Sequence, residues 1–325
     1  MQASAQQALS LSSIASALKS SLRDQPGMAF TGVLAVAMVV ASMLGAILDP
    51  KVITGEAAWI KPAKFGISFA VYAASLIWML SLLKPSKWVR WAGILTAVGF
   101  TVEAVIIVLQ VVRGERSHFN QATPFDNTLW LLMGVFVGVI WVAGLIAAVL
   151  VWRAPNVNPT LALALKFGVV LMLVGALLAG FMTVPTSEQL ALGDAGKPMP
   201  LSGTHTFGAA EDGPKIPFVG WSSVGGDGRV AHFVGLHALQ VLPLVGWWIS
   251  RRSRWSTSQR NRLVILASLG YGGITALLAW QAQRGQSIVS PDVLTLTAFG
   301  IGTALLILGC IATLLIRGAD QPRTV

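Results

Sequence analysis

Charged residues are scarce in this sequence. Asp, Glu, Lys and Arg make up only 11% of its 325 residues, whereas soluble globular proteins carry about 25%. Hydrophobic residues account for 54% of the chain, and its mean hydropathy is +0.71. So little polar surface cannot form a water-soluble shell, which excludes a cytosolic enzyme, a disordered chain and a fibrous repeat. The composition predicts a polytopic membrane protein.

Cysteine is almost absent, because Cys310 is the single one and it lies in an apolar run. A disulfide framework, a cysteine-ligated zinc site and an iron–sulfur cluster are therefore excluded. The sequence also lacks a Walker lysine loop, a Rossmann glycine fingerprint and a convincing Ser/His/Asp order. The net charge of +10 does not form a basic patch interleaved with exposed aromatic residues, so nucleic-acid binding is not predicted.

Long stretches without Asp, Glu, Lys or Arg predict eight transmembrane helices. A helix needs about 20 apolar residues to cross the hydrocarbon layer, and one of the eight stretches is interrupted only by Glu103. The runs are continuous rather than alternating, which predicts helices and excludes a barrel. The predicted spans are 25–48, 65–83, 91–112, 127–152, 167–187, 230–250, 263–283 and 293–316.

Basic residues are concentrated on one side of the predicted membrane. The side that holds both termini has 14 Lys and Arg but only Asp24 and Asp320 as acids, whereas the other side has nine basic and ten acidic residues. The positive-inside rule makes the basic side cytoplasmic. We therefore expect a multi-pass protein of the cytoplasmic (inner) membrane with both termini inside and with basic residues against lipid headgroups.

The chain divides into two halves and two ends. Residues 1–27 form an N-terminal cytoplasmic or interfacial segment, in which Leu11, Ile14, Leu18 and Leu22 have the spacing of an amphipathic helix; a polar tail is the alternative. The halves are 28–155 and 156–317, the second including a long outer loop at 184–229. Residues 318–325 are the C-terminal tail.

Three ordered matches indicate that the halves are an internal duplication. The strongest places Gly99-Phe100, Gln110 and Arg113-Gly114-Glu115 on Gly270-Tyr271, Gln281 and Arg284-Gly285-Gln286 at a constant offset of 171 residues. Asp126 and Gly134 match Asp292 and Gly300 at an offset of 166, and Lys61-x-Ala63-Lys64-Phe65 matches Arg229-x-Ala231-His232-Phe233 at 168. We therefore predict two parallel four-helix repeats, related by a pseudo-twofold axis along the membrane normal, with a binding site at their interface. The pair Gly134 and Gly138 predicts a close helix–helix approach.

Ionisable and amide residues gather at the outer side. All four histidines fall there or just inside the membrane boundary, and the outer loop around His205 is a candidate lid or a plain connector. His232 and His237 are five residues apart, which turns them about 140° from each other on a helix and prevents them from sharing one metal. Glu103 lies ten residues before Arg113, about 15 Å from the outer end of its helix, where a carboxyl group marks a pathway or proton site or is a hydrogen-bonded structural residue.

Lysine, arginine and amide groups at an apolar rim suit a carboxylate, a phosphate or a quinone-type headgroup. Mutual salt bridges and lipid-headgroup anchoring are the alternative explanation. The candidate ligand-binding residues are Lys61, Lys64, Glu103, Gln110, Arg113, Glu115, His118, Arg229, His232, His237, Gln240, Gln281 and Arg284.

The four-plus-four layout with inner termini resembles that of the heme A synthases. The resemblance implies heme-binding histidine pairs on spans 2, 4, 6 and 8 and a Glu-x-x-His-Arg signature on span 2. Here span 2 has Lys61-Pro62-Ala63-Lys64 at its mouth, and spans 4 and 8 contain no histidine. The resemblance therefore covers the architecture alone, and no functional residue is carried over from it.

The preferred function is the binding of a small anionic or amphiphilic ligand in an outward-facing pocket between the halves, with transport of that ligand as its extension. One alternative is a heme- or metal-dependent oxidoreductase or transferase that uses His118, His232 or His237. A second is a non-catalytic sensor or assembly partner. The sequence assigns neither a cofactor nor an oligomeric state.

Overall fold

The computed structural model describes residues 23–153 and 157–316 of the chain. Within them, eight helices are long and apolar enough to cross a membrane, which confirms the all-α class and the eight predicted spans. They are α2 (Pro26–Leu48), α3 (Ile60–Ser81), α4 (Lys87–Arg113), α5 (Pro124–Trp152), α6 (Pro159–Leu178), α9 (Gly228–Ser250), α10 (Thr257–Gln283) and α11 (Val293–Leu315). Helix α3 begins earlier than the predicted residue 65, because counting charge-free residues excluded Lys61 and Lys64 although both are helical. The helix predicted from Leu11 to Leu22 lies outside the described residues.

Capping residues set the ends of these helices. The side chains of Ser86, Thr123, Asn158 and Asp292 each accept a hydrogen bond from a backbone N–H in the first turn of α4, α5, α6 and α11. Such caps satisfy N–H groups that have no partner inside the helix. Helix α4 ends at Gly114, whose φ of 78° is the left-handed conformation that glycine adopts without strain.

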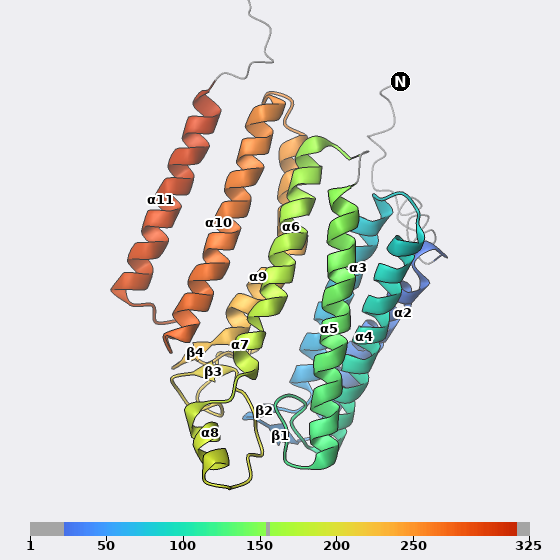
Figure 1. Ribbon diagram of the computed structural model, residues 1–325, viewed down its shortest axis with the longest axis vertical. Helices are drawn as coiled ribbons and strands as arrows, with labels where there is room; N and C mark the ends of the chain where they lie inside the picture. Colours follow the sequence, from blue (N-terminus) through green and yellow to red (C-terminus); the bar gives the residue numbers. More distant parts are fainter. Residues whose placement is uncertain (1–22, 154–156, 317–325) are drawn as a thin grey trace, which may run out of the picture.

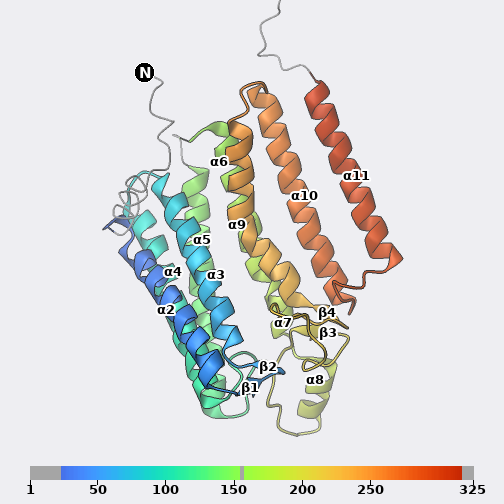
Figure 2. The same ribbon diagram turned by 180° about the vertical axis from the view of Figure 1, so that it is seen from behind.

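The helices form two sets that lie side by side (Figures 1 and 2). In the first set α2 packs on α3 and α4, and α4 packs on α5; in the second set α6 packs on α9 and α10, and α10 packs on α11. Helices α5 and α6 join the sets, with Trp141 Nε1 donating to the carbonyl of Leu173 at 3.2 Å. Helices α2 and α11 lie at opposite edges of the bundle.

The closest helix approach is made by a glycine pair that the sequence analysis did not select. A Cβ atom built on Gly235 of α9 would lie 2.5 Å from the Cα of Gly175 on α6, so the two backbones touch. A Cβ on Gly134 or Gly138 of α5 would meet no atom within 4 Å in the described part of the chain. Within the described chain no helix therefore uses the close approach that Gly134 and Gly138 allow, because small residues permit such a contact without specifying where it forms.

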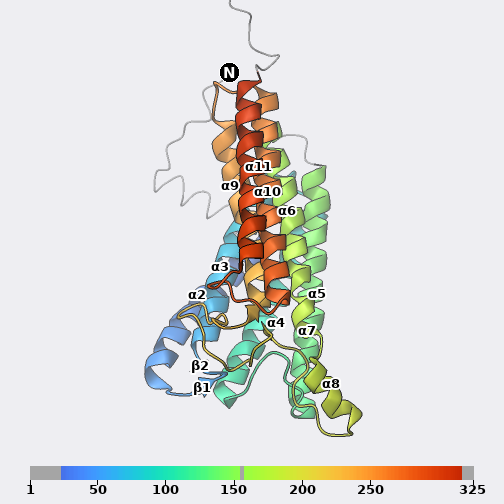
Figure 3. The same ribbon diagram turned by 90° about the vertical axis from the view of Figure 1, so that its left-hand side faces the viewer.

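One end of the bundle carries the long connection between α6 and α9, and we call it the loop end. This connection contains α7 (Gly180–Thr183), α8 (Ser187–Asp194) and β3 (Thr206–Phe207), which pairs with β4 (Gly226–Asp227) directly before α9. A second antiparallel pair, β1 (Val52–Ile53) with β2 (Glu56–Ala57), lies between α2 and α3. Helix α8 lies beyond the ends of α6, α10 and α11, at the level of the loop end of α5 (Figures 1 and 3).

Candidate functional site

Three of the four histidines meet at the loop end, from three different parts of the chain. His118 follows α4, His205 lies in the long connection, and His232 is the fifth residue of α9. The ring centroids of His118 and His205 are 6.4 Å apart, and the fields of His205 and His232 both act on His118. We call His118, His205 and His232 the histidine cluster.

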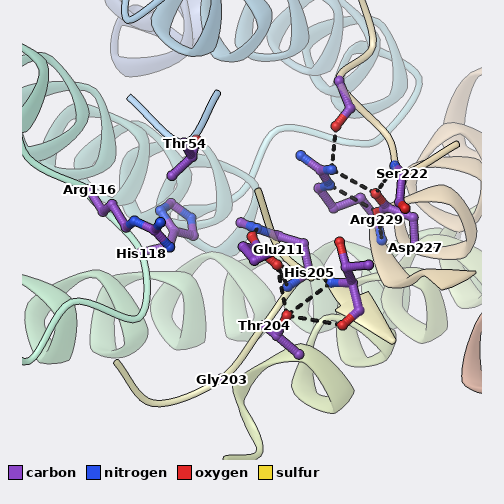
Figure 4. A network of polar contacts seen from close by, with 12 residues as sticks. Thr54, Arg116, His118, Gly203, Thr204, His205, Glu211, Ser222, Asp227 and Arg229 are labelled. Atoms are coloured by element: carbon purple, nitrogen blue, oxygen red, sulfur yellow. Dashed lines mark hydrogen bonds and ion pairs between the residues drawn. The ribbon is translucent and has the colours of Figure 1, made fainter. Parts of the chain in front are cut away.

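His205 is held by a carboxylate that sequence analysis missed. Its Nδ1 lies 2.5 Å from Oε1 of Glu211, and Oε2 of Glu211 accepts hydrogen bonds from Thr204 Oγ1 at 2.7 Å and from the backbone N–H groups of His205 and Thr206 (Figure 4). Burial raises the pKa of Glu211, but the hydrogen bonds from His205 and Thr204 outweigh it and hold the pKa below its usual value. An ionised carboxylate only accepts, so Nδ1 of His205 carries a proton and its Nε2 is the free acceptor when the ring is neutral.

His232 is oriented in the same way by a backbone carbonyl. Its Nδ1 lies 2.8 Å from the oxygen of Gly175, next to the contact between Gly175 and Gly235. A carbonyl oxygen only accepts hydrogen bonds, so Nδ1 of His232 is also the protonated nitrogen. The ring therefore keeps Nε2 for another donor.

The Nδ1 atom of His118 accepts a hydrogen bond, whereas the Nδ1 atoms of His205 and His232 donate one. Nδ1 of His118 lies 3.2 Å from Nζ of Lys61 and 3.1 Å from Oγ of Ser117, and its ring packs against Phe65 and Trp130. Burial lowers the pKa of His118 well below its ordinary value, and the nearby charge of Lys61 lowers it further. The ring is therefore neutral near pH 7, and Nδ1 accepts a hydrogen bond from the Lys61 ammonium group.

Lys61 differs from the other cations of the loop end, most of which are already paired. Within residues 23–153 and 157–316, no carboxylate oxygen lies within 4.0 Å of Lys61 Nζ. The paired residues are Lys51 with Asp49 (3.4 Å), Lys64 with Glu56 (3.2 Å), Arg113 with Asp126 (2.6 Å), Arg116 with Asp212 (3.0 Å), Arg229 with Asp227 (2.6 Å) and Arg284 with Asp292. Among the described loop-end residues, Lys197 and Lys215 also lack a carboxylate contact, and Lys215 donates to the Thr54 carbonyl. Lys61 differs from both because it lies beside the histidine cluster.

A hairpin of the long connection spans the two helix sets. Its rungs are the bridge between Lys215 and Ser222 and the hydrogen bond from Ile216 N to the Trp221 carbonyl; we call residues 214–223 the loop hairpin. Lys64 of α3 donates to its Val219 carbonyl at 3.2 Å, and Arg229 of α9 donates to its Gly220 carbonyl at 2.5 Å. Each helix set thus holds the same turn by one cation.

Two residues of the site are partly exposed. The side chains of His205 and Glu211 keep 19% and 21% of their surface exposed. Both residues lie in the long connection rather than in a membrane-spanning helix.

Other predicted site residues lie at some distance from the cluster. His237 contacts Gln240 at 3.2 Å, and Gln240 Nε2 donates to Ser75 Oγ at 3.0 Å across the two helix sets; both are deeper along α9. Glu115 is exposed beyond the end of α4. Glu103 is 3% exposed, and its Oε1 has no hydrogen-bond partner among the described residues.

Gln110 and Gln281 close the turns that follow their helices. Gln110 Nε2 donates to the carbonyl of Arg116 at 3.1 Å, and Gln281 Nε2 donates to the carbonyl of Ser287 at 2.9 Å. These two contacts join residues at the same separation in the chain. Gln110 also donates to Asp126 at 2.9 Å, which further satisfies that buried carboxylate.

Sequence reasoning missed Thr204, Glu211 and the Gly175 carbonyl. Glu211 and Thr204 lie in a Gly- and Pro-rich segment without periodicity, so their partners depend on the path of the chain. Among the described residues, no group of three or more His, Cys, Asp or Glu side chains is arranged to hold a metal ion.

Comparisons with known proteins leave the site to be interpreted from its own chemistry. No model of a protein family, no curated protein and no solved structure matches this chain.

Proposed function

We propose that this protein is a multi-pass protein of the cytoplasmic membrane that binds a small anion at its loop end, on the outer side. The observation that carries the proposal is Lys61, a cation without a carboxylate contact in the described chain, set beside His118. An anion there would gain a charge-assisted hydrogen bond from the ammonium group. His205 and His232 stand within electrostatic reach of the same place, and protonated rings would add hydrogen-bond donors.

The distribution of basic residues supports the proposed orientation. At the end opposite the loop end, Arg251 and Arg252 lie over the rings of Trp247 and Trp248, 4.1 and 4.2 Å from their centroids. Tryptophan with arginine is typical of a membrane interface, and an excess of basic residues is typical of the cytoplasmic one. The histidine cluster then faces the extracytoplasmic solution.

We further propose that the two helix sets arose by duplication and form parallel repeats. Contacts at matched positions support this proposal. Gly99 packs on Ile140 and Gly270 packs on Leu306, while Arg113 pairs with Asp126 and Arg284 pairs with Asp292. The glutamine contacts at the ends of α4 and α10 repeat in the same way.

Anion binding is tested by thermal unfolding of the purified protein with sodium chloride, sodium acetate or sodium octanoate, at ionic strength held constant with sodium sulfate. These anions keep a single charge between pH 6 and pH 9, and octanoate adds an amphiphilic tail. We expect at least one anion to stabilise the wild type, by about 2.7 kcal/mol at a hundred times its Kd. A variant Lys61→Gln should lose this stabilisation, and Lys61→Arg should keep part of it.

The matched control is Lys51→Gln, because Lys51 is a loop-end lysine that already contacts Asp49 and the Val112 carbonyl. Its anion response should equal that of the wild type. The proposal is wrong if no anion stabilises the wild type, or if Lys61→Gln responds as strongly as Lys51→Gln.

A further inference from the structure

We propose that the anion bound at Lys61 is an oxyanion that carries a hydroxyl group, such as bicarbonate, and that this hydroxyl donates a hydrogen bond to Nε2 of His205. The inference rests on the proposed function and adds to it the chemical class of the ligand. Its basis is the juxtaposition of two rings, His118 and His205, whose centroids are 6.4 Å apart and whose neighbours give them opposite hydrogen-bonding roles.

His118 has an N–H group available for a ligand. Its Nδ1 lies 3.2 Å from Nζ of Lys61, and an ammonium group can donate a hydrogen bond but cannot accept one. A neutral imidazole carries a single proton, so Nδ1 accepts and the proton of His118 is on Nε2. Lys61 and His118 together therefore provide donors for the oxygens of an anion.

His205 has an acceptor instead. The carboxylate of Glu211 lies 2.5 Å from its Nδ1 and fixes the proton on that atom. Burial holds the pKa of His205 below its ordinary value although Glu211 raises it, so the ring is neutral near pH 8 and Nε2 has a free lone pair. A charged oxygen beside this lone pair would be repelled, whereas a hydroxyl hydrogen would satisfy it.

The two rings are close enough for one small ion to contact both. One oxygen atom that is hydrogen-bonded to two nitrogens holds them up to about 5.8 Å apart, and an ion with several oxygens spans more. Phe119 packs against both rings in a T-shaped arrangement, with centroids 6.1 Å from His118 and 4.8 Å from His205. Because Lys61 contacts His118, the charged oxygens and the hydroxyl of the same ion can meet their separate partners.

Replacing Glu211 with glutamine should move the proton on His205. Oε2 of Glu211 accepts hydrogen bonds from the backbone N–H groups of His205 and Thr206, at 2.9 and 3.2 Å. Backbone N–H groups only donate, so the glutamine must place its carbonyl oxygen there and its NH2 group beside Nδ1 of His205. The amide then donates to Nδ1, and the proton of the ring moves to Nε2. The variant therefore has a donor where the wild type has an acceptor, in nearly the same shape.

Isothermal titration calorimetry near pH 8 compares sodium bicarbonate with sodium nitrate. Both anions are planar, singly charged and similar in size, but only bicarbonate carries a hydroxyl. Because nitrate is also the weaker hydrogen-bond acceptor, the ratio of the Kd for nitrate to the Kd for bicarbonate is compared between variants. We expect this ratio to fall about tenfold from the wild type to Glu211→Gln, since one hydrogen bond to the hydroxyl is lost.

Asp212→Asn is the matched control, because it removes the neighbouring carboxylate, which is 57% exposed and pairs with Arg116. Its ratio of Kd values should equal that of the wild type. The inference is overturned if Glu211→Gln keeps the ratio of the wild type, or if Asp212→Asn lowers the ratio as much as Glu211→Gln does.

Nuclear magnetic resonance of the wild type with isotope-labelled histidine gives a second measurement that needs no variant. It should find the proton of His205 on Nδ1 and that of His118 on Nε2. The opposite assignment for either ring overturns the inference while leaving anion binding intact. If neither anion binds the wild type, or if Lys61→Gln binds both as tightly as the wild type, the proposed function itself fails.

Discussion

Replacing Gly235 with alanine tests the contact that positions His232. A Cβ atom on Gly235 would lie 2.5 Å from the Gly175 Cα, so α6 and α9 must separate by about 1 Å to restore van der Waals contact. Such overpacking typically costs about 1–3 kcal/mol. The same shift stretches the 2.8 Å hydrogen bond from His232 to the Gly175 carbonyl, which costs about 1 kcal/mol more.

Alanine has a higher helix propensity than glycine, which offsets about 1 kcal/mol of this loss. Gly235→Ala should therefore lower the free energy of unfolding by about 1–3 kcal/mol in total. The measurement is equilibrium unfolding in mixed micelles, followed by tryptophan fluorescence and by circular dichroism. The control is Gly273→Ala in α10, where an added Cβ meets no atom within 4 Å, so alanine should leave stability unchanged or raise it.

The reasoning is refuted if Gly235→Ala is as stable as Gly273→Ala. It is also refuted if Gly235→Ala loses stability but retains the full anion response of the wild type, because the displaced carbonyl should release the ring of His232. The two readouts thus separate the packing contact from its role in orienting the ring.

Three further predictions concern stability and topology. The pKa of His118 in the folded protein lies below its value in the unfolded chain, so the unfolded state binds a proton first on acidification. The free energy of unfolding should therefore fall below about pH 6.5, by up to about 1.4 kcal/mol per pH unit. Thermal scans of His118→Asn should show a weaker dependence of the melting temperature on pH. Arg113→Gln removes the cation from Asp126, whose side chain is 2% exposed, and should lower the free energy of unfolding by about 2–3 kcal/mol in the same assay. Arg116→Gln removes the cation from Asp212, which is 57% exposed, and should lower it by less than about 1 kcal/mol. With Cys310→Ser as background, a membrane-impermeant maleimide should label Glu188→Cys in intact cells and Ser253→Cys only in opened membranes; the reverse pattern contradicts the proposed orientation.

The helices could be predicted from the sequence because the membrane imposes a simple length requirement. A run of apolar residues long enough to cross the bilayer leaves few alternatives to a helix. The helix starts were predicted less well: α3, α4, α6 and α10 all begin before their predicted first residues, by up to eight residues at α6. Charged residues such as Lys61, Lys64 and Lys166 lie inside these helices, because a lysine side chain can extend toward the interface while its backbone remains helical.

The partners of the charged residues could not be predicted in the same way. The sequence predicts that Lys61, Lys64 and Arg229 lie near one membrane boundary, but their different contacts depend on carboxylates in connecting segments. Glu56 reaches Lys64 from β2, and Glu211 reaches His205 instead of Lys61. Loop paths are set by turns and by individual hydrogen bonds rather than by a periodic pattern. The lack of a carboxylate contact at Lys61 among the described residues therefore becomes apparent only in three dimensions.

Lys64 and Arg229 donate hydrogen bonds to adjacent carbonyls of the loop hairpin, so the two ends of the bundle are restrained unequally. The two helix sets cannot part at that end without breaking a charge-assisted hydrogen bond from one of them. At the opposite end, no comparable pair of hydrogen bonds joins the two helix sets among the described residues. A rocking motion would consequently pivot about the hairpin, so that the two helix sets separate more readily at the opposite end than at the loop end.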